Sequence, residues 1–215
     1  MRVAVGRRTI GIELARVTLE ARLLVNLPKM KTHKYAVMTG ALKNLFGLLP
    51  DPMRILYHWA LDEVIAALTD IWFGRMAVVM DGIVAMEGDG PIYGRPVQMG
   101  LLLCSRNPIA LDTVAARLMG IDPARVRHIG LAAERCGWSG DICVDGLPAE
   151  EVARSFARAG QRWFVRFEGW LMRHPTAVRI IFSDPFRRYI SRPFRALLTR
   201  LRGGSYSWYD GRDQR

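Results

Sequence analysis

Apolar and polar positions follow two different periods along the chain, and together they predict an α/β fold. Short apolar runs at 22–27 and 76–80 are typical of buried strands, and a third strand is expected at 98–104. Across 52–72, apolar residues recur at spacings of three and four, which predicts an amphipathic helix. Further helices are expected at 35–49, 108–119 and 123–136. Strands that alternate with helices favour a three-layer-like α/β domain with a largely parallel or mixed sheet.

Weaker patterns predict the remaining elements of this domain. Short strands are expected near 3–5 and 9–14, and an edge strand at 141–145. The segment 82–96 contains several glycines and prolines, so a loop is expected there. Binding sites in α/β folds lie at the carboxyl ends of strands, and this loop is expected to fold over the mouth of such a site.

The formal net charge of +11 is distributed unevenly along the chain. Residues 1–150 carry 17 basic and 15 acidic side chains, a net charge of +2, whereas residues 151–215 carry 14 basic and 5 acidic side chains, a net charge of +9. This shift divides the chain into an α/β domain at 1–150 and a helical, Arg-rich and aromatic-rich extension at 151–215.

The extension is where a large partner would bind. Aromatic rings alternate with arginines in it, which suits a membrane surface, so 161–202 is a candidate membrane contact. Alternatively, the rings pack on the α/β domain while the arginines face water. Nucleic acid is disfavoured as a partner because no recognisable binding motif accompanies the charge.

The sequence shows neither an apolar run long enough to span a bilayer nor a secretory signal at its start. A cytoplasmic location is therefore expected. The protein could also attach, from the cytoplasm, to the inner face of the membrane. The three cysteines are widely spaced and form no CxxC pair, so packed or free thiols are expected.

The lysines indicate a binding site. Of the 31 Lys and Arg side chains only four are lysines, and all four lie in one short window: Lys29, Lys31, Lys34 and Lys43. Arginine supplies the positive charge everywhere else, which suggests that an ammonium group is needed in this window. Lysine offers a compact charge and a pKa that burial can lower, which guanidinium does not.

The spacing inside this window predicts an anion site. Lys29, Lys31 and His33 alternate, so an extended backbone places all three on one side. Lys43 and Asn44 follow on the expected helix and would complete a site for a phosphate or a carboxylate. The alternative is a solvated basic loop.

Acidic residues form a second candidate group. Asp81 follows a buried strand, Glu87 lies in the expected loop and Asp112 lies in the next helix. These are candidate ligands for a divalent metal, and Asp81 and Glu87 are candidate acid–base groups. Gly88 and Gly90 would let the loop contact the substrate. Alternatively, Asp81 forms a turn and Asp112 pairs with an arginine.

Several ordered strings resemble one known family. They are LPKMKTH, TGALKNLFG, the downstream His58, the Thr69–Ile71 helix end, VVMDGIVAMEGDGPIYG, PIALD and DICVDG. Over about residues 20–156 the chain is similar to the uncharacterised domain-of-unknown-function 362 family. The resemblance implies a role for His58 in binding substrate or metal. Asn107 departs from the family pattern, which favours an acidic residue there.

The resemblance also implies partners and a missing part. Many members carry a ferredoxin-like segment that binds iron–sulfur clusters, but this chain lacks the closely spaced cysteines such a cluster needs. A redox role would therefore require a separate ferredoxin-like partner. Members usually have more sequence before the first motif, so an element of the sheet is expected to be missing here.

Two classes of function follow from these residues. In an enzyme, the lysines and Asn44 would hold an anionic substrate while Asp81 or Glu87, with or without a divalent metal, moves a proton. TGALKNLFG is also similar to the lysine segment of lactate racemase-like proteins, which would give Lys43 a covalent or cofactor-bearing role. Alternatively, the site only binds its anion, as a carrier, a sensor or a redox-associated module. A buried lysine with a lowered pKa would favour the enzyme, and fully exposed lysines would favour simple binding.

Overall fold

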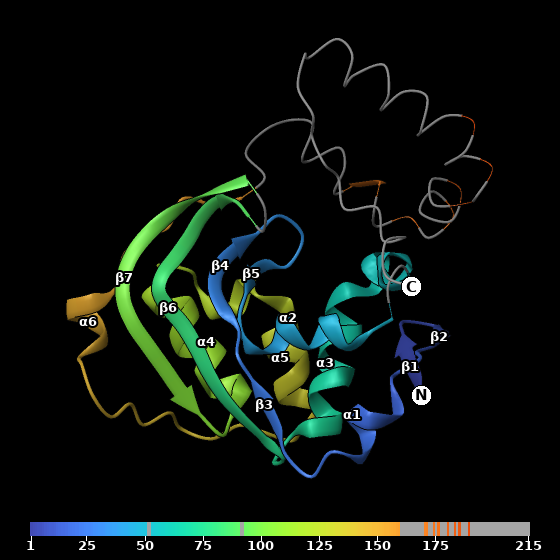
Figure 1. Ribbon diagram of the computed structural model, residues 1–215, viewed down its shortest axis with the longest axis horizontal. Coiled ribbons are helices and arrows are strands. Elements are labelled where there is room, and N and C mark those ends of the chain that lie inside the picture. Colours follow the sequence, from blue (N-terminus) through green and yellow to red (C-terminus); the bar gives the residue numbers. More distant parts are fainter. Residues whose placement is uncertain are drawn as a thin grey trace.

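The computed structural model describes residues 1–50, 53–90 and 93–159, together with isolated positions between 170 and 189. It contains a mixed five-stranded sheet with helices packed on it, which confirms the predicted α/β class (Figure 1). The strands of this sheet are β3 Leu24–Asn26, β4 Lys29–His33, β5 Val37–Thr39, β6 Met76–Asp89 and β7 Tyr93–Ser105.

The long strand β6 organises the sheet. β7 pairs antiparallel with it along one edge. Along the other edge lie β3 and then β4, both parallel to β6. β5 pairs antiparallel with β4. β3 and β4 thus behave as one strand interrupted at Leu27 and Pro28, because proline cannot donate a ladder hydrogen bond.

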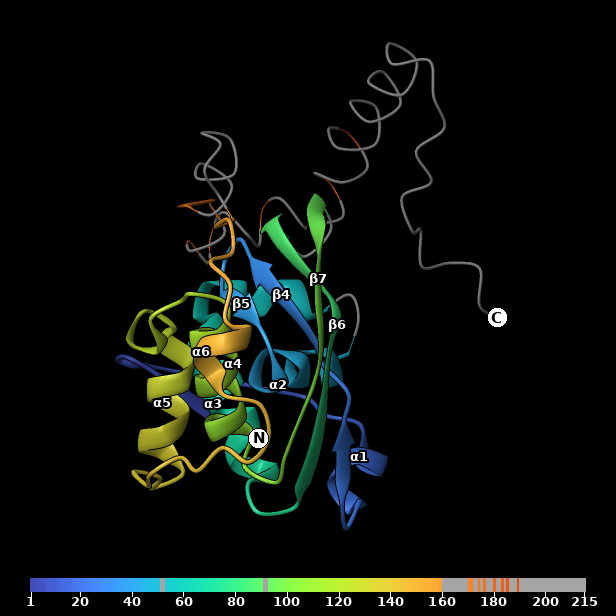
Figure 2. The ribbon, with the colours of Figure 1, turned by 90° about the vertical axis from the view of Figure 1, so that its left-hand side faces the viewer.

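The helices α2, α3, α4 and α5 lie together on one face of the sheet (Figure 2). The α-helices are α1 Arg16–Glu20, α2 Ala41–Asn44, α3 Leu61–Trp72, α4 Pro108–Leu118, α5 Arg127–Arg135 and α6 Ala149–Val152. Three 3-10 helices are η1 Leu45–Leu48, η2 Met53–Ala60 and η3 Pro123–Arg125. A separate hairpin of β1 Arg2–Val5 and β2 Arg8–Gly11 packs against α3.

Side chains alternate between the two faces of the sheet. Met30, Val78 and Met80 are buried in the core under the helices. On the opposite face, Val25 remains 58% exposed and Leu102 60% exposed. The described helices therefore cover one face of the sheet. The strand predicted at 22–27 as buried is buried on that face alone.

The predicted loop at 82–96 is wrong, because most of this segment belongs to the β6–β7 hairpin. Its glycines lie where two strands approach closely. A Cβ at Gly82 would lie 3.1 Å from the carbonyl oxygen of Leu101, and one at Gly94 would overlap Met86. The ladder also shifts register between Gly82 and Val84. Glycines that looked like turn signals are thus strand glycines at close approaches and at a bulge.

Three other predicted elements differ from the structure. The helix expected at 35–49 is replaced by β5, the single turn of α2 and η1. The helix expected at 52–72 begins as the 3-10 helix η2 and becomes α-helical at Leu61. The segment 141–145 forms no strand. Helices at 108–119 and 123–136 are confirmed to within a few residues, the second opening with η3.

The packed body continues to Ala157. The backbone N–H groups of Arg154 and Phe156 donate to the carbonyls of Leu118 and Met119 at 2.8 and 3.0 Å. Most of the predicted helical extension at 151–215, and nearly all of the candidate membrane contact at 161–202, lies outside the described residues. Among the helices that the structure describes, none is long and apolar enough to cross a membrane.

Candidate functional site

The candidate site lies where β4 meets α2. β4 carries Lys29, Lys31 and His33, and α2 carries Lys43 in its last turn. Lys29 and Lys31 are half-exposed while the residues between and after them are buried, so the predicted alternation is confirmed for these two lysines. We call Lys31, His33 and Lys43 the basic cluster.

Asp112 on α4 fixes the beginning of α2. Its two carboxylate oxygens accept hydrogen bonds from the backbone N–H groups of Ala41, at 2.6 Å, and Leu42, at 2.9 Å. The carboxylate is fully buried, and burial raises its pKa to about 6. Only glycine fits at position 40, because a Cβ there would overlap the Asp112 carboxylate. Asp112 therefore positions the helix that carries Lys43.

Asn26 on β3 fixes the other end of α2. Its side-chain Nδ2 donates to the Ala41 carbonyl at 2.8 Å, and its Oδ1 accepts from Nδ2 of Asn44 at 2.8 Å. The predicted ligand-binding residue Asn44 is thus engaged with Asn26. Asn26 was not among the predicted site residues, although a polar residue inside an apolar strand was a usable signal.

Lys29 and Asp81 neutralise each other. They are register partners on β4 and β6, and Nζ of Lys29 lies 2.6 Å from Oδ2 of Asp81. The Lys29 hydrogen bond, aided by the backbone N–H of Ile83, holds the pKa of Asp81 below its ordinary value against the opposing effect of burial. Lys29 therefore contributes less free positive charge to the site than its position in the sequence predicts.

His33 is a neutral hydrogen-bond donor. Its Nδ1 accepts from the backbone N–H groups of Tyr35 and Ala36, both at 3.1 Å, so this nitrogen carries no proton. Burial lowers the pKa of His33 to about 2, and the nearby charges of Lys43, His58, Lys34 and Lys31 lower it further in the same direction. The single ring proton must then lie on Nε2.

Lys43 has an unusual environment for an ammonium group. Its Nζ lies 4.5 Å from the centroid of the Phe46 ring. Burial lowers the pKa of Lys43 to about 8, with further lowering by the positive charges of Arg54 and Lys31. Burial also lowers the pKa of Lys31, and Lys29 adds to that effect. Within the described part of the chain, no carboxylate lies within 4.0 Å of the Lys31 or Lys43 ammonium.

Aromatic rings line the site beside Lys43. The ring of His58, from η2, meets the rings of Tyr35 and Phe46 edge to face, with centroids 5.6 and 5.3 Å apart. Tyr35 in turn lies 5.8 Å from His33. His58, predicted from the family pattern, is therefore next to the cluster, whereas Tyr35 and Phe46 were not predicted. The Phe46 ring, which contacts the Lys43 amine, contributes to the burial of that amine.

Glu87 is engaged in holding the end of β6. One oxygen accepts from Arg95 at 3.0 Å, and the other accepts from the backbone N–H of Ala157 at 2.8 Å. The structure therefore places this predicted acid–base residue in contacts with β7 and the C-terminal segment.

Gly88 and Gly90 do not border an open loop. Their backbone carbonyls accept hydrogen bonds from β4 and from the residue that follows it. The Gly88 carbonyl accepts from Oγ1 of Thr32 at 2.8 Å, and the Gly90 carbonyl accepts from the backbone N–H of Lys34 at 3.2 Å. A Cβ at Gly90 would overlap the Thr32 carbonyl. Gly90 thus allows the backbone after β6 to approach the strand that carries the basic cluster, whereas Gly88 has a φ of +80°, a conformation that favours glycine.

The predicted metal ligands are not brought together. No group of three or more His, Cys, Asp or Glu side chains that could hold a metal ion occurs among the residues that the structure describes. Asp81, Glu87 and Asp112 each have separate partners: Lys29, Arg95 with Ala157, and the start of α2.

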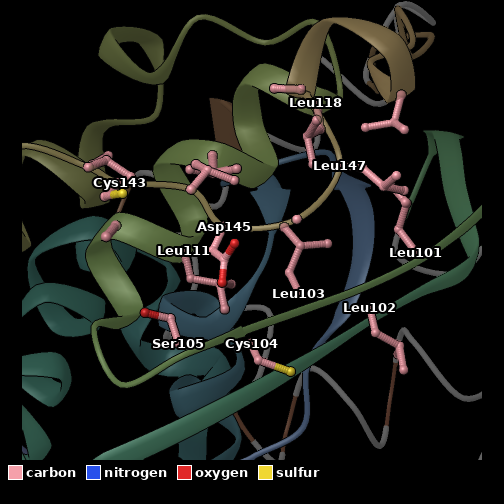
Figure 3. A pocket seen from close by; sticks show the side chains of 17 residues that line it. Leu101, Leu102, Leu103, Cys104, Ser105, Leu111, Leu118, Cys143, Asp145 and Leu147 are labelled. Carbon is pink, nitrogen blue, oxygen red and sulfur yellow. The ribbon is translucent and has the colours of Figure 1, made fainter.

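A hollow lined mostly by apolar residues lies at the β7 edge of the sheet. It has a volume of about 380 Å³ and lies between β7, α4 and the segment 142–147 (Figure 3). Leu101, Leu103 and Leu111 contribute to its wall, as does the free thiol of Cys143. No member of the basic cluster lines it, so it is separate from the candidate site.

Comparisons with known proteins identify the family. The chain is 35% identical over 137 residues to the thylakoid-associated protein sll1697 of Synechocystis sp. (strain ATCC 27184 / PCC 6803 / Kazusa). That match covers 59% of this chain and 41% of the relative, so the chain spans less than half of the relative's length. No solved structure matches. A family model described as a domain of unknown function (DUF362) matches residues 1–117, more than half of the 215 residues, and the chain therefore belongs to that family.

Proposed function

We propose that the protein binds a small molecule bearing a carboxylate or a phosphate at the basic cluster. The observation that carries the proposal is the pair of half-buried lysines, Lys31 and Lys43, with no described carboxylate within 4.0 Å of either ammonium. Burial and the positive charges of Arg54 and Lys31 lower the pKa of Lys43, so its ammonium form is destabilised relative to water. A bound anion would relieve this repulsion, and that relief is a source of binding free energy.

His33 supplies directional recognition beside these charges. Its Nδ1 is occupied by two backbone N–H groups, so its Nε2–H is the available donor. None of the described residues accepts a hydrogen bond from this nitrogen, and the atom is not fully enclosed. A neutral donor in the same cluster as two ammonium groups suits a carboxylate or phosphate oxygen.

The lowered pKa of Lys43 supports an enzyme over a simple carrier. A group with a pKa of about 8 exchanges protons readily near neutral pH, which suits a general acid or base. Asp81 and Glu87 are engaged with Lys29 and Arg95, so we assign proton transfer to Lys43 and a positioning role to the two carboxylates. A carrier or sensor that uses the same site is the alternative, and a separate ferredoxin-like partner stays a prediction from the resemblance.

Equilibrium dialysis of the full chain against inorganic phosphate and lactate tests the proposal. Lys31→Ala and Lys43→Ala should each weaken binding by at least about tenfold, corresponding to loss of roughly 1.4 kcal/mol from a charged hydrogen bond. Lys29→Ala is the matched control, because the Lys29 charge is already paired with Asp81. Unchanged binding in both cluster variants, or equal weakening in the control, would remove the proposal.

Contact with a membrane surface is a second candidate function. It rests on the aromatic and arginine pattern at 161–202 and on the name of the thylakoid-associated relative. Flotation with vesicles of anionic lipid should carry the full chain upward more than a variant that ends at residue 160. Equal flotation of the two proteins would rule this contact out.

A further inference from the structure

We propose that Lys43 forms an imine with the carbonyl carbon of a small 2-oxo acid, whose carboxylate is held by Lys31. This inference rests on the proposed anion site and names the class of its substrate. It is carried by three groups: the Lys43 amine, which packs 4.5 Å from the centroid of the Phe46 ring, the Lys31 ammonium on β4, and the neutral imidazole of His33, whose Nδ1 is occupied by backbone N–H groups.

The position of Lys43 is fixed to a degree that a surface lysine is not. It lies on a helix of one turn, Ala41–Asn44, which Asp112 anchors at its beginning and Asn26 anchors at its end. Its Nζ packs 4.5 Å from the centroid of Phe46. A nucleophile must be held in one geometry to attack a bound carbonyl, and this arrangement provides it.

The electrostatics of the cluster suit a nucleophilic amine. An amine attacks only when it is neutral, and lysines are activated in proteins by burial and by neighbouring cations. Both effects act on Lys43, because burial and the charges of Arg54 and Lys31 lower its pKa to about 8. No described carboxylate is within 4.0 Å to hold the amine in its charged form.

The same residues account for the steps of the reaction. The Lys43 nitrogen donates its lone pair to the carbonyl carbon, the C=O π electrons move to oxygen, and the oxygen takes up a proton. Nε2–H of His33 is the donor available to stabilise that oxygen. Loss of the hydroxyl group as water then leaves a C=N bond to Lys43, so one amine and one carbonyl give one imine and one water. No oxidant or reductant is required.

Reductive trapping of the full chain tests this inference. Incubation with pyruvate and sodium cyanoborohydride should add one N-(1-carboxyethyl) group, and peptide mapping should place it on Lys43. The map is simple because the chain has four lysines, all between positions 29 and 43. Lys43→Arg should lose the adduct, and Lys34→Arg, the matched control, should keep it. The α-amino group of Met1 provides the background level of labelling.

The pH dependence separates covalent attack from simple binding. The rate of adduct formation should rise as the pH increases through about 8, because the neutral amine is the nucleophile. Non-covalent binding of lactate, which has no carbonyl group, should weaken over the same range. Labelling spread evenly over the four lysines would overturn the imine. Absence of an adduct while lactate still binds would overturn it and leave the anion site intact, whereas absence of any anion binding would overturn the proposed function as well.

Discussion

Asp112 accepts a hydrogen bond of 2.6 Å from the backbone N–H of Ala41, which lies 71 residues earlier in the chain. This contact joins α4 to the single turn of α2, and α2 carries Lys43. Asp112, the most deeply buried carboxylate of the predicted site, thus holds α2 in place. The proposed chemistry is assigned to the lysines.

Loss of this contact should destabilise the fold. Asp112→Asn keeps the shape of the side chain but turns an amide N–H toward a backbone N–H, so one buried donor loses its acceptor. We expect the free energy of unfolding to fall by about 2 kcal/mol, as measured by urea denaturation. Gly40→Ala should cost a similar amount, about 1–3 kcal/mol, because its Cβ overlaps the Asp112 carboxylate.

A third variant, Asp112→Ala, checks the cause of the Gly40 effect. The methyl group and the carboxylate compete for one space, so the losses from Gly40→Ala and Asp112→Ala should not add in the double variant, because Asp112→Ala removes the carboxylate. Additive losses would show that Gly40 is required for some reason other than Asp112.

The buried Asp112 carboxylate should also give stability a characteristic pH dependence. Burial raises its folded pKa from the ordinary 3.8 to about 6, so the folded protein binds this proton more tightly than the unfolded chain does. Raising the pH from about 4 to about 6 should therefore lower wild-type stability relative to Asp112→Asn. Urea midpoints measured across this range should converge as the pH rises. A constant difference between the two proteins would mean that Asp112 titrates normally.

The Lys29–Asp81 ion pair should contribute little to stability. Its side chains are 41% and 46% exposed, and solvent screens a pair at such a site. A double-mutant cycle with Lys29→Ala and Asp81→Ala should give a coupling free energy of at most about 1 kcal/mol. A coupling well above that value would assign the pair a larger structural role than its exposure suggests.

Lys43 should be the lysine whose reactivity titrates near pH 8. Competitive labelling with acetic anhydride, followed by peptide mapping, gives the pH at which its amine is half neutral, and we expect about 8. Arg54→Gln should move this value upward, because the Arg54 charge lowers the pKa of Lys43. A midpoint that does not respond to the change would leave burial and the Lys31 charge as the causes.

The sequence pointed to the residues of the basic cluster more clearly than to the partners of the carboxylates. The confinement of the lysines to one window pointed to Lys31, His33 and Lys43, and the alternation on β4 followed from strand geometry. The partners of Asp81 and Asp112 could not be predicted, because they depend on strand register and on a contact between α4 and α2. The periodicity of a single segment reveals neither the register of a strand nor a contact between two helices.

The hairpin of β6 and β7 shows why local signals fail. The glycines at 82 and 94 suggest a loop by composition, yet close cross-strand packing at both and the bulge after Gly82 need glycine as much as a turn does. Similarly, the apolar spacing at 35–49 favoured a helix, but pairing of Val37–Thr39 with β4 stabilises a strand there. Tertiary pairing overrides local propensity in both segments.

Calorimetric titration of the full chain with lactate at pH 8 tests the anion site most directly. Comparing Tris with triethanolamine, which differ in ionisation enthalpy, gives the number of protons taken up on binding. Because a bound anion stabilises the ammonium form of Lys43, its pKa should rise from about 8 and the wild type should take up a fraction of a proton. Lys43→Met should show weaker binding and no uptake. Tight binding without proton uptake in the wild type, or equal uptake in Lys43→Met, would contradict an anion site built around this lysine.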